Sequence, residues 1–286
     1  MNSALFGLVA ALSWGVHDFA ARFPSRAVGA IPTVLAVTLS GLIALSAWLL
    51  IAGGGLEIAW PKLWLPALTG IFFALATLSL FTALAIGPIS VVAPITGSYP
   101  AFAMLIALAQ GARPSLLQWL AVAGVMLGVF IVSRSGARYE QNGALAQGTL
   151  KGIVGLAFLA SFCFAIALSA GQAAVQAFGE IEAVWLARCF GLVTIGALYL
   201  WQSPGAPVPL RWLPLLGVMG LLDVLALATI TAAGNLPSPE FATVVSSAFG
   251  AITVLLARIF LKEPIAPAQL AGMVLIFGGV AVLAGL

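Results

Sequence analysis

The chain consists of long apolar stretches separated by short groups of polar and turn-forming residues. Most stretches hold about 20 residues, the length a helix needs to cross the apolar core of a bilayer. Together with Gly, Pro and charged residues between them, they predict ten spans. These lie near residues 3–22, 30–52, 63–86, 88–110, 115–134, 150–171, 182–202, 211–233, 238–260 and 267–286. The sequence therefore predicts an all-α integral membrane protein with ten transmembrane helices.

One long polar segment, SRSGARYEQNGALAQG at residues 133–148, divides the predicted spans into two groups of five. The predicted domains are a first five-helix repeat at 1–137, a linker at 138–148 and a second five-helix repeat at 149–286. Because each repeat has an odd number of spans, the second enters the membrane in the opposite direction. The result is a pair of inverted repeats, a common scaffold of carriers that work by alternating access.

The two halves match in sequence when the chain is shifted by 150 residues, or by 151 near the end of each half. The aligned pairs include Gly70 with Gly220, the turn ARP at 112–114 with KEP at 262–264, and Gln118 with Gln269. This internal similarity supports the division into repeats.

The fourth span is interrupted by residues that weaken a helix. The predicted helix-breaking positions are Pro94 and Pro100, with Gly250 opposite Pro100 in the second half. Proline cannot donate to the carbonyl four residues earlier, and a carbonyl without a partner is tolerated at membrane depth only against protein or a water-filled cavity. Matching interruptions in two repeats point to a transporter's binding site. The residues expected to bind substrate there are Thr96, Gly97, Ser246 and Ser247.

Composition excludes a soluble domain. The chain is 63% hydrophobic and 7% charged, whereas soluble domains carry about 25% charged residues. Its mean hydropathy is +1.18. The N-terminus has no basic region of a signal peptide, so the first apolar stretch is expected to be a retained helix. The loop cations suit anionic lipid headgroups, and no patch for nucleic acid is present.

Two ionisable side chains are predicted deep inside spans: Asp223 near the middle of the eighth, and Arg188 about two turns into the seventh. Such groups usually mark pathways or proton relays. A carboxylate and a guanidinium facing one cavity would bind the ammonium and carboxylate groups of a zwitterion. The alternatives are a structural ion pair between the two side chains or, for Arg188, extension to the headgroups.

The first span carries a stripe of small and polar residues at helical spacing. On it, Trp14 and His17 are candidate substrate-binding residues. Because histidine titrates near neutral pH, His17 also suggests proton coupling. The alternative for both is packing between helices. Asp18 is expected to pair with Arg22, one turn further along the helix.

Aromatic residues supply further candidates on the spans expected to line a cavity. They are Phe73, Tyr99 and Phe249, of which the last two correspond across the repeats. Aromatic walls fit apolar or aromatic side chains of a ligand. The alternative is that these rings fill the core of the helix bundle.

Several motifs recur in a fixed order. The chain opens with Gly-x6-Trp-Gly at Gly7, Trp14 and Gly15; the proline-containing fourth span ends in GARPS and its counterpart in LKEPI; the fifth span has the form Gln-x9-Gly. In order and duplication these motifs resemble the paired EamA-type modules of the drug/metabolite transporter superfamily. The chain departs from that family in its first half, where Arg113 occupies a turn position that is commonly acidic. In the second half, Glu263 supplies the acidic residue.

The resemblance implies a bacterial inner-membrane carrier, similar to ten-span amino-acid exporters, that moves amino acids or similar metabolites through a central cavity. The expected partners are a small-molecule substrate, the lipid bilayer and, as candidate coupling ions, protons; a monomer is compatible with the sequence. No cofactor, metal or nucleic acid is expected. The alternatives are a carrier for other metabolites or drugs in either direction, a channel, and an intramembrane enzyme. The last is disfavoured because the sequence lacks the usual catalytic motifs.

Two arguments disagree about the orientation of the termini, which ten spans place on one side. Of the eleven Lys and Arg residues, Lys62, Arg113 and Arg188 lie on the side of the termini and the other eight in the alternate loops. The positive-inside rule places the termini outside the cytoplasm. The family resemblance implies cytoplasmic termini, and we favour it because the charge excess in each loop is modest.

Overall fold

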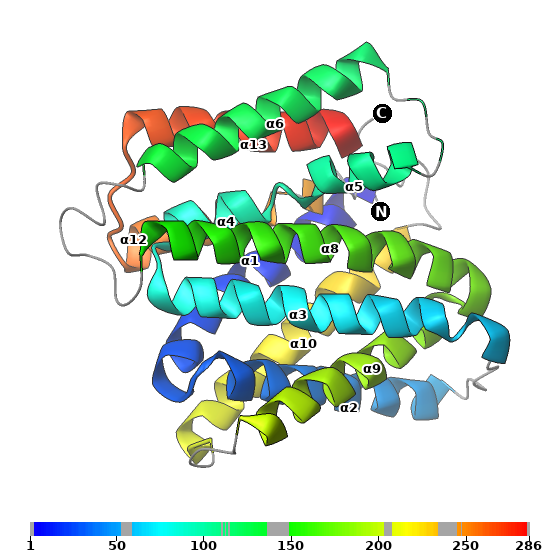
Figure 1. Ribbon diagram of the computed structural model, residues 1–286. Coiled ribbons are helices and arrows are strands. Elements are labelled where there is room, and N and C mark those ends of the chain that lie inside the picture. Colours follow the sequence, from blue (N-terminus) through cyan, green and yellow to red (C-terminus); the bar gives the residue numbers. More distant parts are fainter. Residues whose placement is uncertain are drawn as a thin grey trace.

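The computed structural model is an all-helical bundle (Figure 1) and describes residues 3–52, 59–109, 111, 113, 115–135, 149–202, 208–233, 245–246 and 248–284. The first half contains α1 (Ser3–Val28), α2 (Ala30–Ala52), the 3-10 turn η1 (Trp60–Lys62), α3 (Trp64–Ile86), α4 (Ile89–Thr96), α5 (Tyr99–Ala109) and α6 (Leu116–Ser135). The second contains α8 (Leu150–Phe178), α9 (Glu180–Trp201), the 3-10 turn η2 (Leu210–Trp212), α10 (Leu213–Ala233), α12 (Phe249–Phe260) and α13 (Pro267–Ala284).

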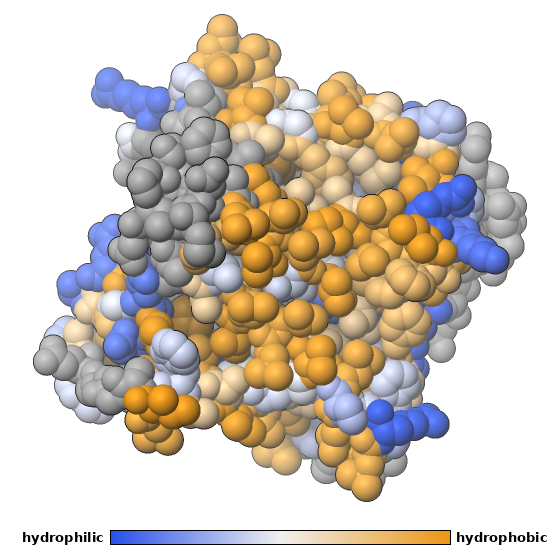
Figure 2. All heavy atoms as spheres, turned by 180° about the vertical axis from the view of Figure 1, so that it is seen from behind, coloured by the Kyte–Doolittle hydropathy of each residue, from blue (hydrophilic) through white to orange (hydrophobic). Residues whose placement is uncertain are grey.

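Seven of the described helical segments are long and apolar enough to cross a membrane. Two shorter apolar helices, Phe249–Phe260 and Pro267–Val282, add to them. Figure 2 shows a broad hydrophobic band across the middle of the molecule, with hydrophilic residues at its two sides. The predicted all-helical membrane fold is confirmed, whereas the count of ten spans stays a prediction.

Two helices are longer than the predicted spans. The first span was expected to end near residue 22, but α1 continues to Val28, and α8 continues from the expected end near 171 to Phe178. In α1 the extra turns carry Arg26, whose Nε donates a 2.6 Å hydrogen bond to a carbonyl at the end of α3. A contact with another helix therefore supports a stretch that hydropathy alone assigns to a loop.

The helix contacts occur in pairs related by the shift of about 150 residues. α3 packs against α8 and α9, and its counterpart α10 packs against α1 and α2. In the same way α5 packs against α8 and α12 against α1, while α6 and α13 pack against each other. The third helix of each half thus lies against the first two helices of the other half.

The aligned glycines Gly70 and Gly220 allow close approach at these contacts. A Cβ on Gly70 would collide with the backbone carbonyl of Ala187 in α9, and a Cβ on Gly220 would collide with the Ser40 hydroxyl in α2. Small residues allow such approach between membrane helices, where van der Waals packing drives association. The interlocking of the halves therefore depends on these positions.

The predicted interruption of the fourth span is present between Thr96, the end of α4, and Tyr99, the start of α5. Pro94 is not the break, contrary to the prediction, because it lies inside the fully buried α4. Because Pro94 has no N–H, it cannot donate to the carbonyl of Ser90 four residues earlier. That carbonyl instead accepts a 2.8 Å hydrogen bond from Nε2 of Gln269. Pro100 is the second residue of α5, where a missing N–H breaks no helical bond.

Candidate functional site

Asp223, near the middle of α10, is the centre of a buried polar cluster formed by Trp14, His17, Asp18, Arg188 and Asp223. Its side chain is 9% exposed. One carboxylate oxygen accepts a 3.0 Å hydrogen bond from the indole Nε1 of Trp14, and the other accepts one from Nη2 of Arg188. Arg188 and Asp223 therefore form an ion pair, which is one of the interpretations that the sequence leaves open.

Arg188 projects from α9 into the bundle beside Gly41 of α2. A Cβ on Gly41 would lie only 2.6 Å from Nη1 of Arg188, so this glycine makes room for the guanidinium. The Arg188 side chain is 10% exposed. It is held inside the bundle by its pair with Asp223. The alternative interpretation, in which the side chain extends toward the lipid headgroups, is therefore wrong.

Asp18 does not pair with Arg22, contrary to the prediction from helical spacing. Its carboxylate lies 2.9 Å from Nδ1 of the adjacent His17, whereas Arg22 lies 3.6 Å from Glu263 of the second half. The prediction was wrong because spacing within one helix takes no account of partners on other helices. His17 packs against the Phe81 ring at 5.7 Å and lies within electrostatic reach of Asp223.

The buried polar cluster contains two carboxylates, Asp18 and Asp223, but only one guanidinium, which pairs with Asp223. With both carboxylates ionised and His17 neutral, the cluster carries one uncompensated negative charge. A buried carboxylate without a compensating charge is strongly destabilising. A proton on the His17–Asp18 pair or the ammonium group of a solute would compensate it. Two buried nitrogens, Nε2 of His17 and Nε of Arg188, have no hydrogen-bond partner among the described residues.

Trp14 connects this cluster to the candidate residue Phe249 at the start of α12. The two rings are in edge-to-face contact, with centroids 6.2 Å apart. One turn further along α12, the hydroxyl of Thr253 donates a 3.2 Å hydrogen bond to the carbonyl of Gly15. The start of α12 is therefore fixed to the part of α1 that carries Trp14.

The candidate residue Phe73 forms an aromatic counterpart of the polar contact between Trp14 and Asp223. The shift of 150 residues relates Trp14 to Phe164 and Asp223 to Phe73. Phe73 packs edge-to-face against Phe164, with ring centroids 5.3 Å apart. The same position is thus polar between α1 and α10 and apolar between α3 and α8.

Gly97, beside the break between α4 and α5, and Gly250, the second residue of α12, both lie close to Phe277 of α13. A Cβ on Gly97 would lie 3.8 Å from Cε1 of Phe277, and a Cβ on Gly250 would lie 3.2 Å from the same atom. A Cβ on Gly250 would also lie 3.4 Å from the carbonyl oxygen of Ala93 in α4. The structure therefore brings together the two weak points that the sequence matches across the repeats.

The remaining candidates lie near these interruptions. Thr96 is buried, and its hydroxyl has no hydrogen-bond partner among the described residues. Tyr99 begins α5 and is partly buried, and Ser246 is buried. Ser247 lies outside the described residues. Thr96 and Tyr99 take no part in the hydrogen bonds of the buried polar cluster.

A second polar group, which the sequence did not reveal as a site, joins the two halves at one end of the bundle. Its charged members are Arg22, Arg26 and Glu263, here called the end cluster. The Glu263 carboxylate accepts hydrogen bonds from the backbone N–H groups of Ile89 at 3.1 Å and Ser90 at 3.0 Å. These residues begin α4, so the carboxylate caps the helix at its positive end.

The two arginines of the end cluster donate hydrogen bonds to backbone carbonyls at the C-terminal end of α3. Nη1 of Arg22 donates to the carbonyl of Gly87 at 2.6 Å, and Nε of Arg26 donates to the carbonyl of Ala85 at 2.6 Å. These carbonyls lie at the end of α3, where the backbone lacks helical donors. The end cluster therefore ties α1 and the α3–α4 junction to the turn between α12 and α13.

The arrangement does not resemble a metal site. Among the described residues no group of three or more His, Cys, Asp or Glu side chains is placed to hold a metal ion. The buried polar cluster instead offers hydrogen bonds and opposite charges, which suit an organic solute or a proton.

The sequence pattern of the EamA-like transporter family matches the chain twice, over residues 1–134 and 151–285. The chain belongs to the EamA-like transporter family. It is accordingly a multi-pass membrane protein of a transporter family within the drug/metabolite transporter superfamily. In this EamA-like transporter, the buried polar cluster and the end cluster each draw residues from both matched ranges.

A solved structure, described only as a crystal structure of a protein, has the same fold as this EamA-like transporter. It aligns with a TM-score of 0.65 at 19% sequence identity, over 98% of this chain and 97% of its own. At this identity the similarity concerns the fold alone. No curated protein matches the sequence.

Proposed function

We propose that this EamA-like transporter is a carrier that exports small organic metabolites across a bacterial inner membrane. Its preferred substrates are amino acids with aromatic or other neutral side chains, as in the bacterial exporter YddG, which the sequence motifs resemble. Ten spans in two inverted five-helix repeats alternate access to a central site. The protein is proposed to work without a cofactor and to catalyse no chemical reaction.

The observation that carries this proposal is the buried polar cluster. It places the carboxylate of Asp223 and the guanidinium of Arg188 together inside a membrane bundle, beside the indole N–H of Trp14. A zwitterion would exchange the internal ion pair for two new ones, because its ammonium suits Asp223 and its carboxylate suits Arg188. Because the cluster holds two carboxylates and one guanidinium, it favours a ligand or coupling ion that brings a positive charge.

The aromatic counterpart of the cluster supports a neutral or aromatic side chain in the substrate. Phe73 and Phe164 occupy the positions that match Asp223 and Trp14 in the other half. A site between the halves would then have one polar and one aromatic wall. Such a pair of walls fits an amphipathic ligand, which is oriented by a few polar groups.

Alternating access requires contacts between the halves that separate at one end while the other end closes. The paired helix contacts, and the packing of Gly97 and Gly250 beside Phe277, provide interfaces where the halves can rock. The end cluster holds the halves together at one end, because Glu263 pairs with Arg22 and accepts hydrogen bonds from the N–H groups of Ile89 and Ser90. In the proposed cycle these bonds separate when the carrier opens at that end.

Counterflow in proteoliposomes tests the proposal with a panel of neutral, aromatic and charged amino acids. Wild-type protein should exchange neutral and aromatic amino acids, and substrate on the opposite side should accelerate uptake, as a carrier requires and a channel does not. Asp223→Asn keeps the size of the side chain but removes its charge, so we expect counterflow to fall and its pH dependence to flatten.

The matched control is Glu182→Gln, which removes a carboxylate in the first turn of α9, outside the cluster. It should leave counterflow unchanged. Full counterflow in a folded Asp223→Asn protein would contradict the assignment of the site. Exchange of other metabolites or drugs without amino acids would replace the substrate class, and flux independent of substrate on the opposite side would indicate a channel.

A further inference from the structure

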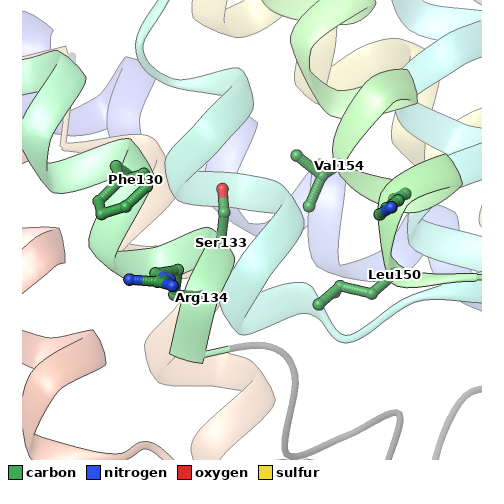
Figure 3. A pocket seen from close by; sticks show the side chains of 6 residues that line it. Phe130, Ser133, Arg134, Leu150 and Val154 are labelled. Atoms are coloured by element: carbon green, nitrogen blue, oxygen red, sulfur yellow. The ribbon is translucent and has the colours of Figure 1, made fainter.

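A groove of about 340 Å³ lies between the end of α6 and the start of α8, and none of its lining residues belongs to the buried polar cluster or the end cluster. It is lined by Phe130, Ser133, Arg134, Leu150, Lys151 and Val154. Figure 3 shows Leu150 and Val154 pointing from α8 toward α6. The wall is largely apolar, and its two charged residues are both cations.

The cations lie at the level where the membrane meets water. Arg134 is the last residue of one apolar span, Leu116–Arg134, and Lys151 is the second residue of the next, Leu150–Phe178. Phe130 and Val154 lie about one turn further into their spans, roughly 5 Å deeper. The groove therefore has a cationic mouth at the membrane surface and an apolar wall that continues toward the acyl chains.

The positive charge of the mouth is not neutralised within the described part of the chain. Neither Arg134 nor Lys151 forms an ion pair there, and the guanidinium of Arg134 lies 5.2 Å from the centre of the Phe130 ring. The mouth also faces the start of α8, the positive end of a 29-residue helix.

We propose that this groove binds an anionic phospholipid of the bilayer. Its phosphate lies between Arg134 and Lys151, and one acyl chain lies along Phe130, Leu150 and Val154. The two cations favour a lipid with net negative charge over a zwitterionic one, whose own ammonium or choline group would oppose them. The apolar wall favours a lipid over a free phosphate, because a soluble anion leaves that wall uncovered.

Such a lipid would bridge α6 of the first matched range and α8 of the second. The inference rests on the groove and its charges, not on the transported solute. Lipid binding is therefore measured without transport, and a failed substrate assignment does not affect it.

Native mass spectrometry of the purified protein with phosphatidylglycerol or phosphatidylcholine tests the site. Wild type should retain phosphatidylglycerol in preference, and Arg134→Gln combined with Lys151→Gln should lower its retention about tenfold or more. The control is Arg211→Gln, because Arg211 also lies over an aromatic ring, that of Trp212 at 5.8 Å, next to the start of a span. It should leave retention unchanged.

A steric variant separates a defined site from general attraction to anionic lipid. Val154→Trp fills the groove and keeps both cations, so it should also reduce phosphatidylglycerol retention. Equal retention in wild type and Val154→Trp, or equal loss in the double variant and Arg211→Gln, would overturn the proposal. So would competition by millimolar glycerol 3-phosphate, which indicates a soluble anion.

The chain's own linker is the other possible occupant of the groove. Replacing the linker, residues 138–148, by a Gly/Ser segment of equal length should leave phosphatidylglycerol retention unchanged if the lipid occupies the groove. An increase in retention would show that the linker fills it instead and would overturn the proposal. Thermal unfolding of every variant shows that differences in retention come from folded protein.

Discussion

Gln269 and Gln118 occupy matching positions in the two halves but bind different partners. Nε2 of Gln269 donates a 2.8 Å hydrogen bond to the buried carbonyl of Ser90 in the other half. Oε1 of Gln118 accepts a 2.8 Å hydrogen bond from the exposed N–H of Ser115, at the start of its own helix. One glutamine therefore joins two halves of the bundle, whereas the other only caps a helix.

This difference predicts unequal effects of the same substitution. Gln269→Ala removes a buried hydrogen bond between the two halves, so we expect a loss of about 1–3 kcal/mol. Gln118→Ala removes part of an exposed cap and should lose about 1 kcal/mol or less. Thermal unfolding of both variants in detergent measures the difference. Equal losses would show that the buried bond from Gln269 stabilises the protein no more than the exposed cap of Gln118 does.

Glu263 should hold the start of α4 in place. Glu263→Ala removes a charged acceptor from the N–H groups of Ile89 and Ser90, with an expected loss of about 1.5–3 kcal/mol. Hydrogen exchange at these two amides should become faster. Glu180→Gln, at the start of α9, serves as the control and should change neither quantity. Unchanged exchange in Glu263→Ala would contradict the capping role.

The ion pair between Arg188 and Asp223 predicts a double-mutant result. Neutralising one partner leaves the other charge buried, so Asp223→Asn and Arg188→Gln should each lower stability by about 3–5 kcal/mol. The double variant should recover much of this loss, because neither charge of the Arg188–Asp223 pair remains without its partner, and Asp18 keeps its own contact with His17. The melting temperatures of wild type, the two single variants and the double variant measure this recovery. Additive losses would show that the two charges do not depend on each other.

The sequence predicts the parts of this structure that follow from local patterns. Apolar stretches of membrane length predict the helices, and the polar cost of two deep charges predicts that Asp223 and Arg188 can pair. The break after Thr96 follows from Gly97 and Pro100. In each case the physical constraint lies within one segment, or in a rule about isolated charges in lipid.

The end cluster was not predictable in the same way. Glu263 and Ile89 are separated by 174 residues, and helical spacing says nothing about such a contact. A signal was present, because Pro94 removes the donor for the Ser90 carbonyl, and a buried carbonyl needs another one. Its identity depends on how the halves pack. For the same reason Asp18 was assigned to Arg22, whose actual partners lie on other helices.

The glycine contacts predict a difference between two Gly-to-Ala substitutions in apolar helices. Gly70→Ala places a methyl group against the Ala187 carbonyl, so α3 and α9 must separate and the protein should lose stability. At Gly196 of α9 a Cβ meets nothing within 4 Å, and Gly196→Ala should be neutral or stabilising by about 0.5–1 kcal/mol. Thermal unfolding compares them, and equal effects would show that the helices do not depend on close approach.

The orientation of the protein can be predicted from the roles of its cations. Figure 1 shows the starts of α4 and α13 and the end of α12 at the same end of the bundle. At this cation-rich end, Arg22 and Arg26 bind carbonyls of the α3–α4 junction, and Nη1 of Arg258 donates to the carbonyl of Glu263 at 3.2 Å. The fold requires these three arginines whichever side they face, so they indicate orientation less strongly than free loop charges.

We therefore expect the orientation of the family, with cytoplasmic termini. A reporter active only in the periplasm should give low activity when fused to the C-terminus. The same reporter inserted in the linker at residues 138–148 should give high activity, because five predicted spans separate that linker from either end of the chain. The reverse pair of results would show that the positive-inside rule was the better guide and that the end cluster faces the cytoplasm.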